Sequence, residues 1–220
     1  MARFVKQPIE ADNNITGCVG YQVIAMYDVI VDKKCLSSIV ASVLEVYNKE
    51  SSGFLIGSQS SKTIHGRKKK VVALKCIYPL QTAFRTPCKV EAGNVSAHRR
   101  AVGSLLTMNL GLVGEFHSHP DWHTRLSKSD IEYIGDEIKT FKNKFKYQMP
   151  NWLEMVVSVK KKEYSSSHSV GFSFRNYVKK VGLTVKTDPY TGYDVTLAGY
   201  WLSHSGGIVE LEKEAKIYTV

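Results

Sequence analysis

The sequence predicts an α/β or α+β protein, a single domain in which helices flank a mixed β-sheet. Apolar runs of strand length alternate along the chain with segments of helical periodicity, the pattern of these fold classes. No repeat or long linker divides the 220 residues, and a chain of this length suffices for one sizeable core. Its 43% hydrophobic and 23% charged residues are ordinary for a soluble globular protein.

The first half of the chain is expected to fold as strand, helix and hairpin. A strand covers Tyr21–Val31, and apolar side chains at helical spacing follow it. The short, glycine-bounded run Ser51–Gly57 predicts a buried strand. A polar, hairpin-like connection over 58–70 joins it to another strand, Val71–Tyr78. The apolar face of the first helix comprises Leu36, Ile39, Val40, Val43 and Tyr47.

The second half is expected to begin with a helix over Val95–Asn109, with Met108 on its inner face. A buried strand, Leu110–Phe116, then leads directly into His117. The remaining expected elements are a third helix with Ile131, Ile134, Ile138, Phe141 and Phe145 on one face, strands over Trp152–Val159 and Val170–Val178, a turn at Pro189–Gly192, and a strand-like tail, Gly207–Val220.

We expect three regions: an N-terminal extension over 1–20, the domain over 21–178, and a C-terminal β extension over 179–220. The first residues lack the apolar stretch of a secretory signal, and no apolar run reaches the roughly 18–20 residues that span a bilayer. The four cysteines are far apart and form no C-x-x-C pair, which favours thiols over disulfides or a zinc finger. We therefore predict a cytoplasmic protein that does not enter a membrane.

The net charge of +10 is spread along the chain, with its densest runs at Arg67–Lys70 and Lys160–Lys162. Each run adjoins a strand-like segment, which favours solvated hairpin ends. A patch for nucleic acid or an acidic protein is the alternative. Because no aromatic residues are interleaved with the charges, we expect no nucleic acid among the partners.

One segment has the spacing of metal ligands. His117 and His119 follow a buried strand, and alternate residues of a strand share a face, so both imidazoles can reach one small cation. Asp130 lies where the third helix is expected to begin, and its carboxylate can turn back toward the strand end. Three protein ligands leave a fourth position for water, which is typical of catalytic rather than structural zinc.

The spacing H-x-H-x7-S-x2-D, which ends here at Asp130, resembles the signature of the JAMM (MPN+) zinc metallopeptidases, which have a JAB domain. The family also has an upstream E-x-x-G-x-x-x-G motif, which Glu50 to Gly57 match. The resemblance covers roughly residues 22–178, and Glu115 followed by Phe is more typical of prokaryotic members. It implies an MPN/JAB domain with a fold similar to that of the cytidine deaminases.

The resemblance also implies an enzyme, an isopeptidase of the deubiquitinase type with one Zn²⁺ per chain held by His117, His119 and Asp130. Glu50 would act as general base toward the attacking water and then protonate the leaving amine, and Ser127 would steady the oxyanion. The implied substrates are the C-terminal tails of ubiquitin-like or sulfur-carrier proteins. Which of them is used, and the oligomeric state, stay open.

Several of these residues also have structural interpretations. Ser127 and Asp130 fit a helix-capping box. Glu115 shares a strand face with the two histidines, and we expect it to support the site rather than react. His123 is expected in a solvated loop rather than on the metal.

Two rival enzyme classes and one other function were weighed. A zinc deaminase needs a C-x-x-C pair, which the chain lacks. A phosphoesterase barrel with an H-x-H pair needs about 250 residues. The alternative that stays open is a catalytically inactive MPN scaffold subunit of a larger complex, from which zinc content separates the enzyme.

Overall fold

The computed structural model describes residues 25–80, 82–87, 89–92, 96–97, 100–101, 103–104, 108, 110–121, 123–145, 151–177, 179–205 and 208–220. The expected extension over 1–20 and most of the helix expected over 95–109 lie outside the described residues. Met108, expected on the inner face of that helix, is 68% exposed, so this prediction was wrong for Met108. The side chains of Phe141 and Phe145 are also outside the described set.

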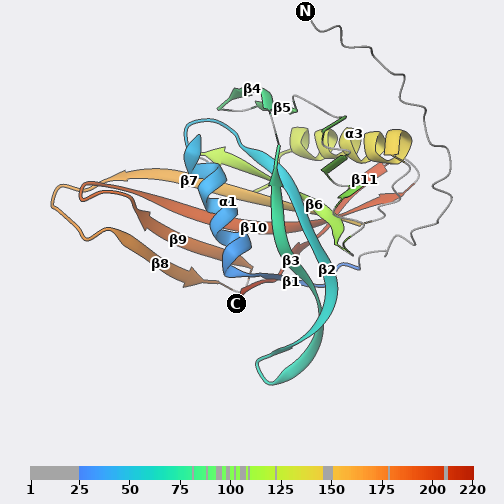
Figure 1. The fold of residues 1–220 in the computed structure, drawn as a ribbon, viewed down its shortest axis with the longest axis horizontal. Helices are drawn as coiled ribbons and strands as arrows, with labels where there is room; N and C mark the ends of the chain where they lie inside the picture. Colours follow the sequence, from blue (N-terminus) through green and yellow to red (C-terminus); the bar gives the residue numbers. More distant parts are fainter. Residues whose placement is uncertain are drawn as a thin grey trace, which may run out of the picture.

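Two helices and twelve strands are bounded within the described residues (Figure 1). The helices are α1 (Lys33–Glu45) and α3 (Lys128–Phe145). The strands are β1 (Asp28–Val31), β2 (Ser52–Ile64), β3 (Arg67–Pro79), β4 (Thr82–Thr86), β5 (Lys89–Ala92), β6 (Gly111–Pro120), β7 (Asn151–Glu163), β8 (Gly171–Asn176), β9 (Lys180–Lys186), β10 (Thr191–Ser205), β11 (Ile208–Ala215) and β12 (Ile217–Thr219).

Ten of these strands form one mixed sheet in the described part of the chain, in the order β12-β1-β3-β2-β6-β7-β10-β9-β8, with β11 paired to β10. The pairs β1–β12, β1–β3 and β6–β7 are parallel, and the other pairs are antiparallel. β4 and β5 form a separate two-stranded sheet. The expected mixed sheet is thus confirmed.

The two helices cover opposite faces of this sheet, because each has one apolar face. On α1, Leu36, Ile39 and Val43 pack against alternate residues of β7 that include Met155. The α3 side chains Ile134 and Ile138, each 2% exposed, pack in the other core. A mixed sheet flanked by helices is therefore the architecture that the alternating pattern predicted. The similarity to the cytidine deaminases stays a prediction.

The hairpin of β2 and β3 is longer than the sequence suggested. Both strands run through most of the polar segment 58–70, and the turn between them consists of only His65 and Gly66, with φ angles of 49° and 74°. Positive φ at both central residues is typical of the tightest β-hairpins. In contrast, the strand expected over Tyr21–Val31 is shorter: Ala25–Tyr27 are not strand, and pairing begins at Asp28.

The C-terminal residues contribute to the same sheet and its core. β10 lies between β7 and β9, and β12 pairs with β1. Trp201 and Leu197 on β10 are fully buried, and the Trp201 indole N–H donates to the Tyr27 carbonyl at 3.0 Å. None of the described helices is long and apolar enough to cross a bilayer.

Candidate metal centre

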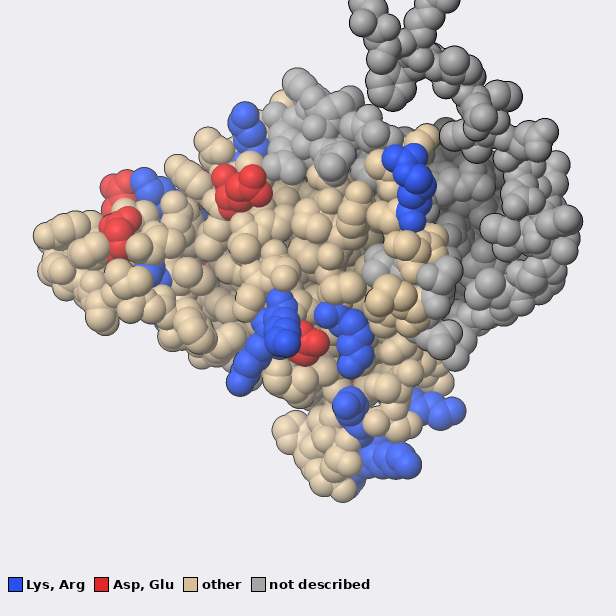
Figure 2. Space-filling model, in the orientation of Figure 1, with Lys and Arg blue, Asp and Glu red and all other residues tan. Residues whose placement is uncertain are grey.

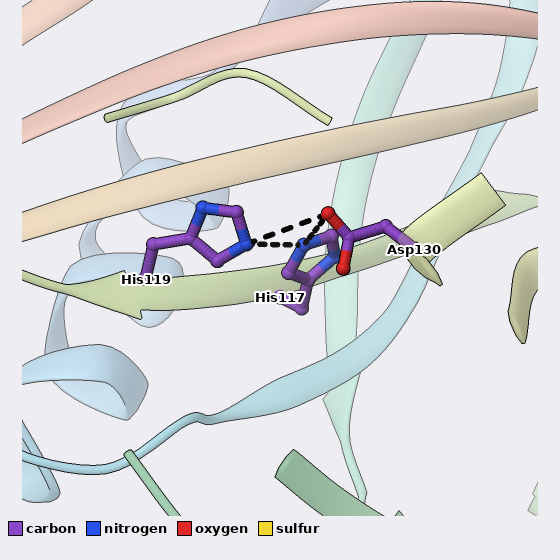
Figure 3. A group of neighbouring side chains, drawn as sticks. All are labelled: His117, His119 and Asp130. Carbon is purple, nitrogen blue, oxygen red and sulfur yellow. Dashed lines mark hydrogen bonds and ion pairs between the residues drawn. The ribbon is translucent and has the colours of Figure 1, made fainter. Parts of the chain in front are cut away.

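His117, His119 and Asp130 come together at the end of β6 (Figure 3). Strand alternation places the two histidines on the face of β6 that α3 covers, since Phe116, the residue before His117, points into the α1 core. Asp130 lies in the first turn of α3 and faces them. One ligand atom from each residue lies within 4.8 Å of the other two.

The distances between these atoms fit a small tetrahedral cation. The two Nε2 atoms are 3.0 Å apart, and Asp130 Oδ2 lies 4.0 Å from His117 Nε2 and 3.8 Å from His119 Nε2. Ligand atoms around tetrahedral zinc, with bonds of about 2.0–2.2 Å, are roughly 3.3 Å apart. Shifts of well under 1 Å would therefore complete the set, and nitrogen and carboxylate oxygen are donors that zinc accepts.

Both histidines are oriented by hydrogen bonds at their other nitrogen. His117 Nδ1 donates to Glu154 Oε1 at 2.6 Å, and His119 Nδ1 donates to the His123 carbonyl at 2.9 Å. Each bond leaves the Nε2 lone pair directed at the shared centre. Glu154, 1% exposed, is itself held by the Trp152 indole N–H, which donates to Oε2 at 2.9 Å. Such partners fix the tautomer and orientation of metal-binding imidazoles.

The two rings differ in basicity in the metal-free protein. Burial opposes protonation of His117, but the hydrogen bond and charge of Glu154, with the charge of Asp130, raise its pKa. Burial and the neighbouring His117 lower the pKa of His119. Metal binding must therefore displace a proton from His117 over part of the pH range, which makes affinity pH-dependent.

Asp130 and Ser127 form the capping box expected as the structural interpretation. The Ser127 N–H donates to Asp130 Oδ2 at 2.6 Å, and the Asp130 N–H donates to Ser127 Oγ at 3.1 Å. Ser127 Oγ also contacts Ser129 Oγ at 2.8 Å. The box therefore fixes the carboxylate that faces the histidines. The oxyanion role of Ser127 stays a prediction.

Glu50 is held close to this centre by the strand that follows it. Ser51 and Ser118 exchange hydrogen bonds: the Ser51 N–H donates to Ser118 Oγ and the Ser118 N–H donates to the Ser51 carbonyl, both at 2.8 Å. Ser118 lies between the two histidines, so this clamp fixes the backbone next to Glu50 relative to them. The Glu50 N–H donates to the Thr86 carbonyl of β4 at 2.8 Å.

The glycines of the E-x-x-G-x-x-x-G motif allow this close packing. A Cβ at Gly53 would lie 2.5 Å from the Phe116 ring, and a Cβ at Gly57 would lie 2.4 Å from the Ala73 carbonyl oxygen of β3. Both contacts are shorter than real Cβ atoms make. A larger residue at either position would push β2 away from β6 or β3, and Glu50 with it.

The Glu50 carboxyl has the proton affinity of a base that works near neutral pH. Burial raises the pKa of Glu50 to about 7, with His117 opposing this rise and Asp130 adding to it. The charges of two of the three candidate ligands therefore affect the pKa of the Glu50 carboxyl. A bound dication would bring its pKa down again.

Glu115 belongs to a buried group of carboxyls behind the histidines. It pairs in register with Glu154 of β7 and is 3% exposed. Burial raises its pKa well above the usual range, and it shares a hydrogen bond with Glu137 of α3. Two carboxyls that share a hydrogen bond need at least one proton between them, so Glu115 and Glu137 hold a buried proton behind the histidines. That Glu115 supports the site rather than reacts stays a prediction. His123 is exposed; its carbonyl accepts from His119 Nδ1, and its ring lies edge-on to the His119 ring with centroids 6.4 Å apart.

Sequence reasoning missed Glu154 and Glu137. A signal for Glu154 was present, because it is the one charged residue within the otherwise apolar run Trp152–Val159. A lone acid in a buried strand needs a partner. The sequence signal for Glu137 is weaker, because this glutamate lies on a helix with other charged residues.

The fold is thus of the α+β class, with a His–His–Asp group between a strand end and a helix start that could hold a metal ion. The chain belongs to the prokaryotic homologues of the JAB domain, whose family model matches residues 32–169. The family inferred from the two motifs is thereby confirmed.

Other comparisons add little. No curated protein matches the sequence significantly. Among solved structures, the solution structure of protein DSY2949 from Desulfitobacterium hafniense is similar at 14% identity, over 87% of this chain and 92% of that one, with a TM-score of 0.46. This likeness is too low to support a conclusion about function.

Proposed function

We propose that the protein is a zinc-dependent isopeptidase that cleaves at the C-terminal tail of a ubiquitin-like or sulfur-carrier protein. The observation that carries the proposal is the group of His117, His119 and Asp130, with both histidine Nδ1 atoms tied and both Nε2 atoms facing one point. Three protein ligands leave one position open, as in catalytic zinc sites. Membership of the JAB-domain family supports a peptidase role.

Each residue of the site has a separate role in the proposed reaction. His117, His119 and Asp130 hold the metal. When bound, zinc lowers the pKa of a water ligand to about 7 and polarises a carbonyl oxygen. Glu50 accepts the proton of the attacking water and returns it to the leaving amine. Its pKa is raised to about 7 in the metal-free protein, and a bound dication lowers it, so the carboxyl is ionised and can accept a proton at neutral pH. Ser127 Oγ donates to the oxyanion of the tetrahedral intermediate.

A tail substrate is supported by the strand next to Glu50. β4 and β5 form a sheet separate from the main one, and the carbonyl of Thr86 in β4 binds the Glu50 N–H. An extended, glycine-ending tail can add to the free edge of such a sheet through main-chain hydrogen bonds. This would deliver one carbonyl to the metal centre and Glu50.

The test is cleavage of a panel of tail-fused ubiquitin-like proteins from the same genome, followed by mass spectrometry. We expect cleavage directly after the terminal glycine, little turnover of an unfolded casein-like chain, and loss of activity in Glu50→Gln. Glu45→Gln, an exposed glutamate at the end of α1, is the matched control and should behave as wild type. Equal turnover of casein would contradict tail specificity. A folded, zinc-loaded protein that cleaves none of the fusions would indicate the inactive scaffold instead.

A further inference from the structure

Residues 61–70 form a two-stranded ribbon that leaves the main sheet, here called the basic ribbon. In the described residues, β2 pairs with β6 only over Ser52–Gly57, and β3 pairs with β1 only over Val71–Leu74. Beyond these points the two strands pair only with each other. Figure 1 shows the ribbon projecting away from the rest of the sheet.

The basic ribbon concentrates positive charge. Residues 51–90 contain eight Lys and Arg residues and no Asp or Glu, in a chain with a net charge of +10. Lys69 lies 3.4 Å from Asp28. The other cations of the ribbon are exposed and pair with none of the described acidic residues, and Figure 2 shows no acidic side chain along the projection on the visible face. These four cations are Lys62, Arg67, Lys68 and Lys70.

The second basic run of the chain, Lys160–Lys162, differs in this respect. Lys161 lies 3.0 Å from Glu163, and Lys162 pairs with Asp194 of β10. Local acids therefore neutralise most of that run. The unpaired charge of the basic ribbon has no such partner in the described residues, which leaves it available for another molecule.

The side chains of the basic ribbon favour phosphate over a protein surface. Cross-strand pairing puts Lys62 and Lys69 on one face and Lys68 and Lys70 on the other, so both faces carry cations. Ile64, the apolar residue of the ribbon, is only 8% exposed. Without an exposed apolar or aromatic anchor, the ribbon lacks the usual centre of a protein–protein interface. Lysine and arginine beside serine and threonine are the residue types that contact phosphate oxygens.

We propose that the basic ribbon, residues 61–70, binds the phosphate backbone of duplex DNA. The major groove of B-DNA admits a two-stranded β-ribbon. One face of the ribbon packs on the protein, because Ile64 lies in a buried cluster with Ile30 and Tyr218. The open face, with Lys68 and Lys70, would enter the groove, and the exposed Lys62 and Arg67 would meet phosphates at its rim. The deep, narrow major groove of A-form RNA does not admit one. This inference revises our expectation from the sequence, which had no means of recognising a ribbon that extends beyond the strands of the main sheet.

DNA binding on the basic ribbon is separate from the chemistry at the metal centre. Ser52 pairs with His117, and Ile64 lies twelve residues further along β2. At about 3.3 Å per residue, the ribbon tip is roughly 40 Å from the metal centre along the strand. The proposal therefore does not depend on the proposed peptidase activity, and it can hold or fail without it.

The four unpaired cations set the expected salt dependence. A protein that neutralises Z phosphates has a slope of about −0.9Z in a plot of log K against log salt concentration, which gives about −3.6 for four contacts. Raising the salt from about 50 to 200 mM would then weaken binding roughly 150-fold. Removing three of the four cations should reduce the slope by about 2.7.

The experiment measures binding of the full chain to a fluorescent mixed-sequence duplex of about 20 base pairs at several salt concentrations. The test variant carries Lys62→Ser, Lys68→Ser and Lys70→Ser, and the matched control carries Lys160→Ser, Lys161→Ser and Lys162→Ser. We expect the test variant to bind at least tenfold more weakly with the reduced slope, and the control to bind as wild type. Arginine at the three tested positions should restore binding, and thermal midpoints should show that all variants are folded.

Four results would overturn the proposal. The first is wild type failing to bind the duplex below about 100 µM at low salt, the weak end of non-specific DNA binding. The second is an equal loss of affinity in both triple variants, which would indicate diffuse charge. The third is displacement of the duplex by polyaspartate at an equal concentration of charges, which would point to an acidic protein. The fourth is equally tight binding of an RNA duplex of the same sequence, which would contradict insertion into the major groove.

Discussion

Glu154 orients His117, and replacing it with glutamine should weaken metal binding while leaving the fold in place. Its two oxygens accept from two donors, His117 Nδ1–H at 2.6 Å and the Trp152 indole N–H at 2.9 Å. A glutamine has one oxygen and one NH₂ group, so it can satisfy only one of these donors. If the NH₂ faces Trp152, two donors meet in a buried site. If it faces His117, the imidazole must move its proton to Nε2, where the metal should bind.

The conflict between these two donors sets the size of the expected loss of metal affinity. Removing a buried partner of a metal-binding histidine costs about 10–100-fold in metal affinity, which is about 1.4–2.7 kcal/mol. The upper part of that range is expected here, because Glu154 is 1% exposed and no water can easily replace it. Leaving one buried donor unpaired costs a similar amount, about 1–3 kcal/mol.

The assay is a zinc titration of metal-free protein against a chromophoric chelator at fixed pH, with circular dichroism to check the fold. Glu163→Gln is the matched control, since this glutamate lies at the exposed end of the same strand. We expect the control to bind zinc as wild type. Wild-type affinity in Glu154→Gln would refute the argument that this carboxylate sets the His117 tautomer.

Three further predictions concern the base, the pH dependence and the motif glycines. Glu50→Gln should lower the cleavage rate about 10²–10⁴-fold at saturating zinc. Glu115→Gln should stay within about tenfold of wild type, because Glu115 is buried against Glu137 and acts only through the neighbouring residues. An inactive Glu115→Gln with an active Glu50→Gln would reverse the assignment. In the metal-free protein the pKa of Glu50 is raised from 4.5 to about 7, so its stabilising effect is full below pH 4.5 and is lost as the pH rises through 7. In urea unfolding, the free energy of unfolding of Glu50→Gln should therefore rise relative to that of wild type between pH 5 and pH 8. A difference that stays constant over this range would contradict the raised pKa. Gly57→Ala, whose Cβ would lie 2.4 Å from a backbone oxygen, should lose about 1–3 kcal/mol of unfolding free energy, whereas Gly103→Ala, with no atom within 4 Å, should not.

That His117, His119 and Asp130 come together was predictable because their geometry is mostly local. Strand alternation puts His117 and His119 on one face, and only twelve residues lie between His117 and Asp130, so a short loop suffices to bring them together. The two glycines after Glu50 were a second signal of the same kind. The partner of His117 was not predictable in this way. Glu154 reaches it only because β6 and β7 pair in parallel with Glu115 opposite Glu154, and α3 lies between these strands in the chain.

The length of the β2–β3 hairpin was missed for a different reason. Alternating polarity marks a strand only when one of its faces is buried. Over residues 61–70 most side chains of the ribbon are exposed, with Ile64 the buried exception, so its polar residues looked like a connection. The pairing that makes it a ribbon is a property of two strands together, and the sequence of either one contains little sign of it.

Zinc content tests the central claim, that His117, His119 and Asp130 form one metal centre, most directly. Elemental analysis of purified protein should give about one zinc per chain, because three ligands with one open position hold a single ion. His117→Ala and Asp130→Ala should each lose most of it, while His65→Ala, at the exposed hairpin turn, should keep it. Full zinc retention in both ligand variants would contradict the account.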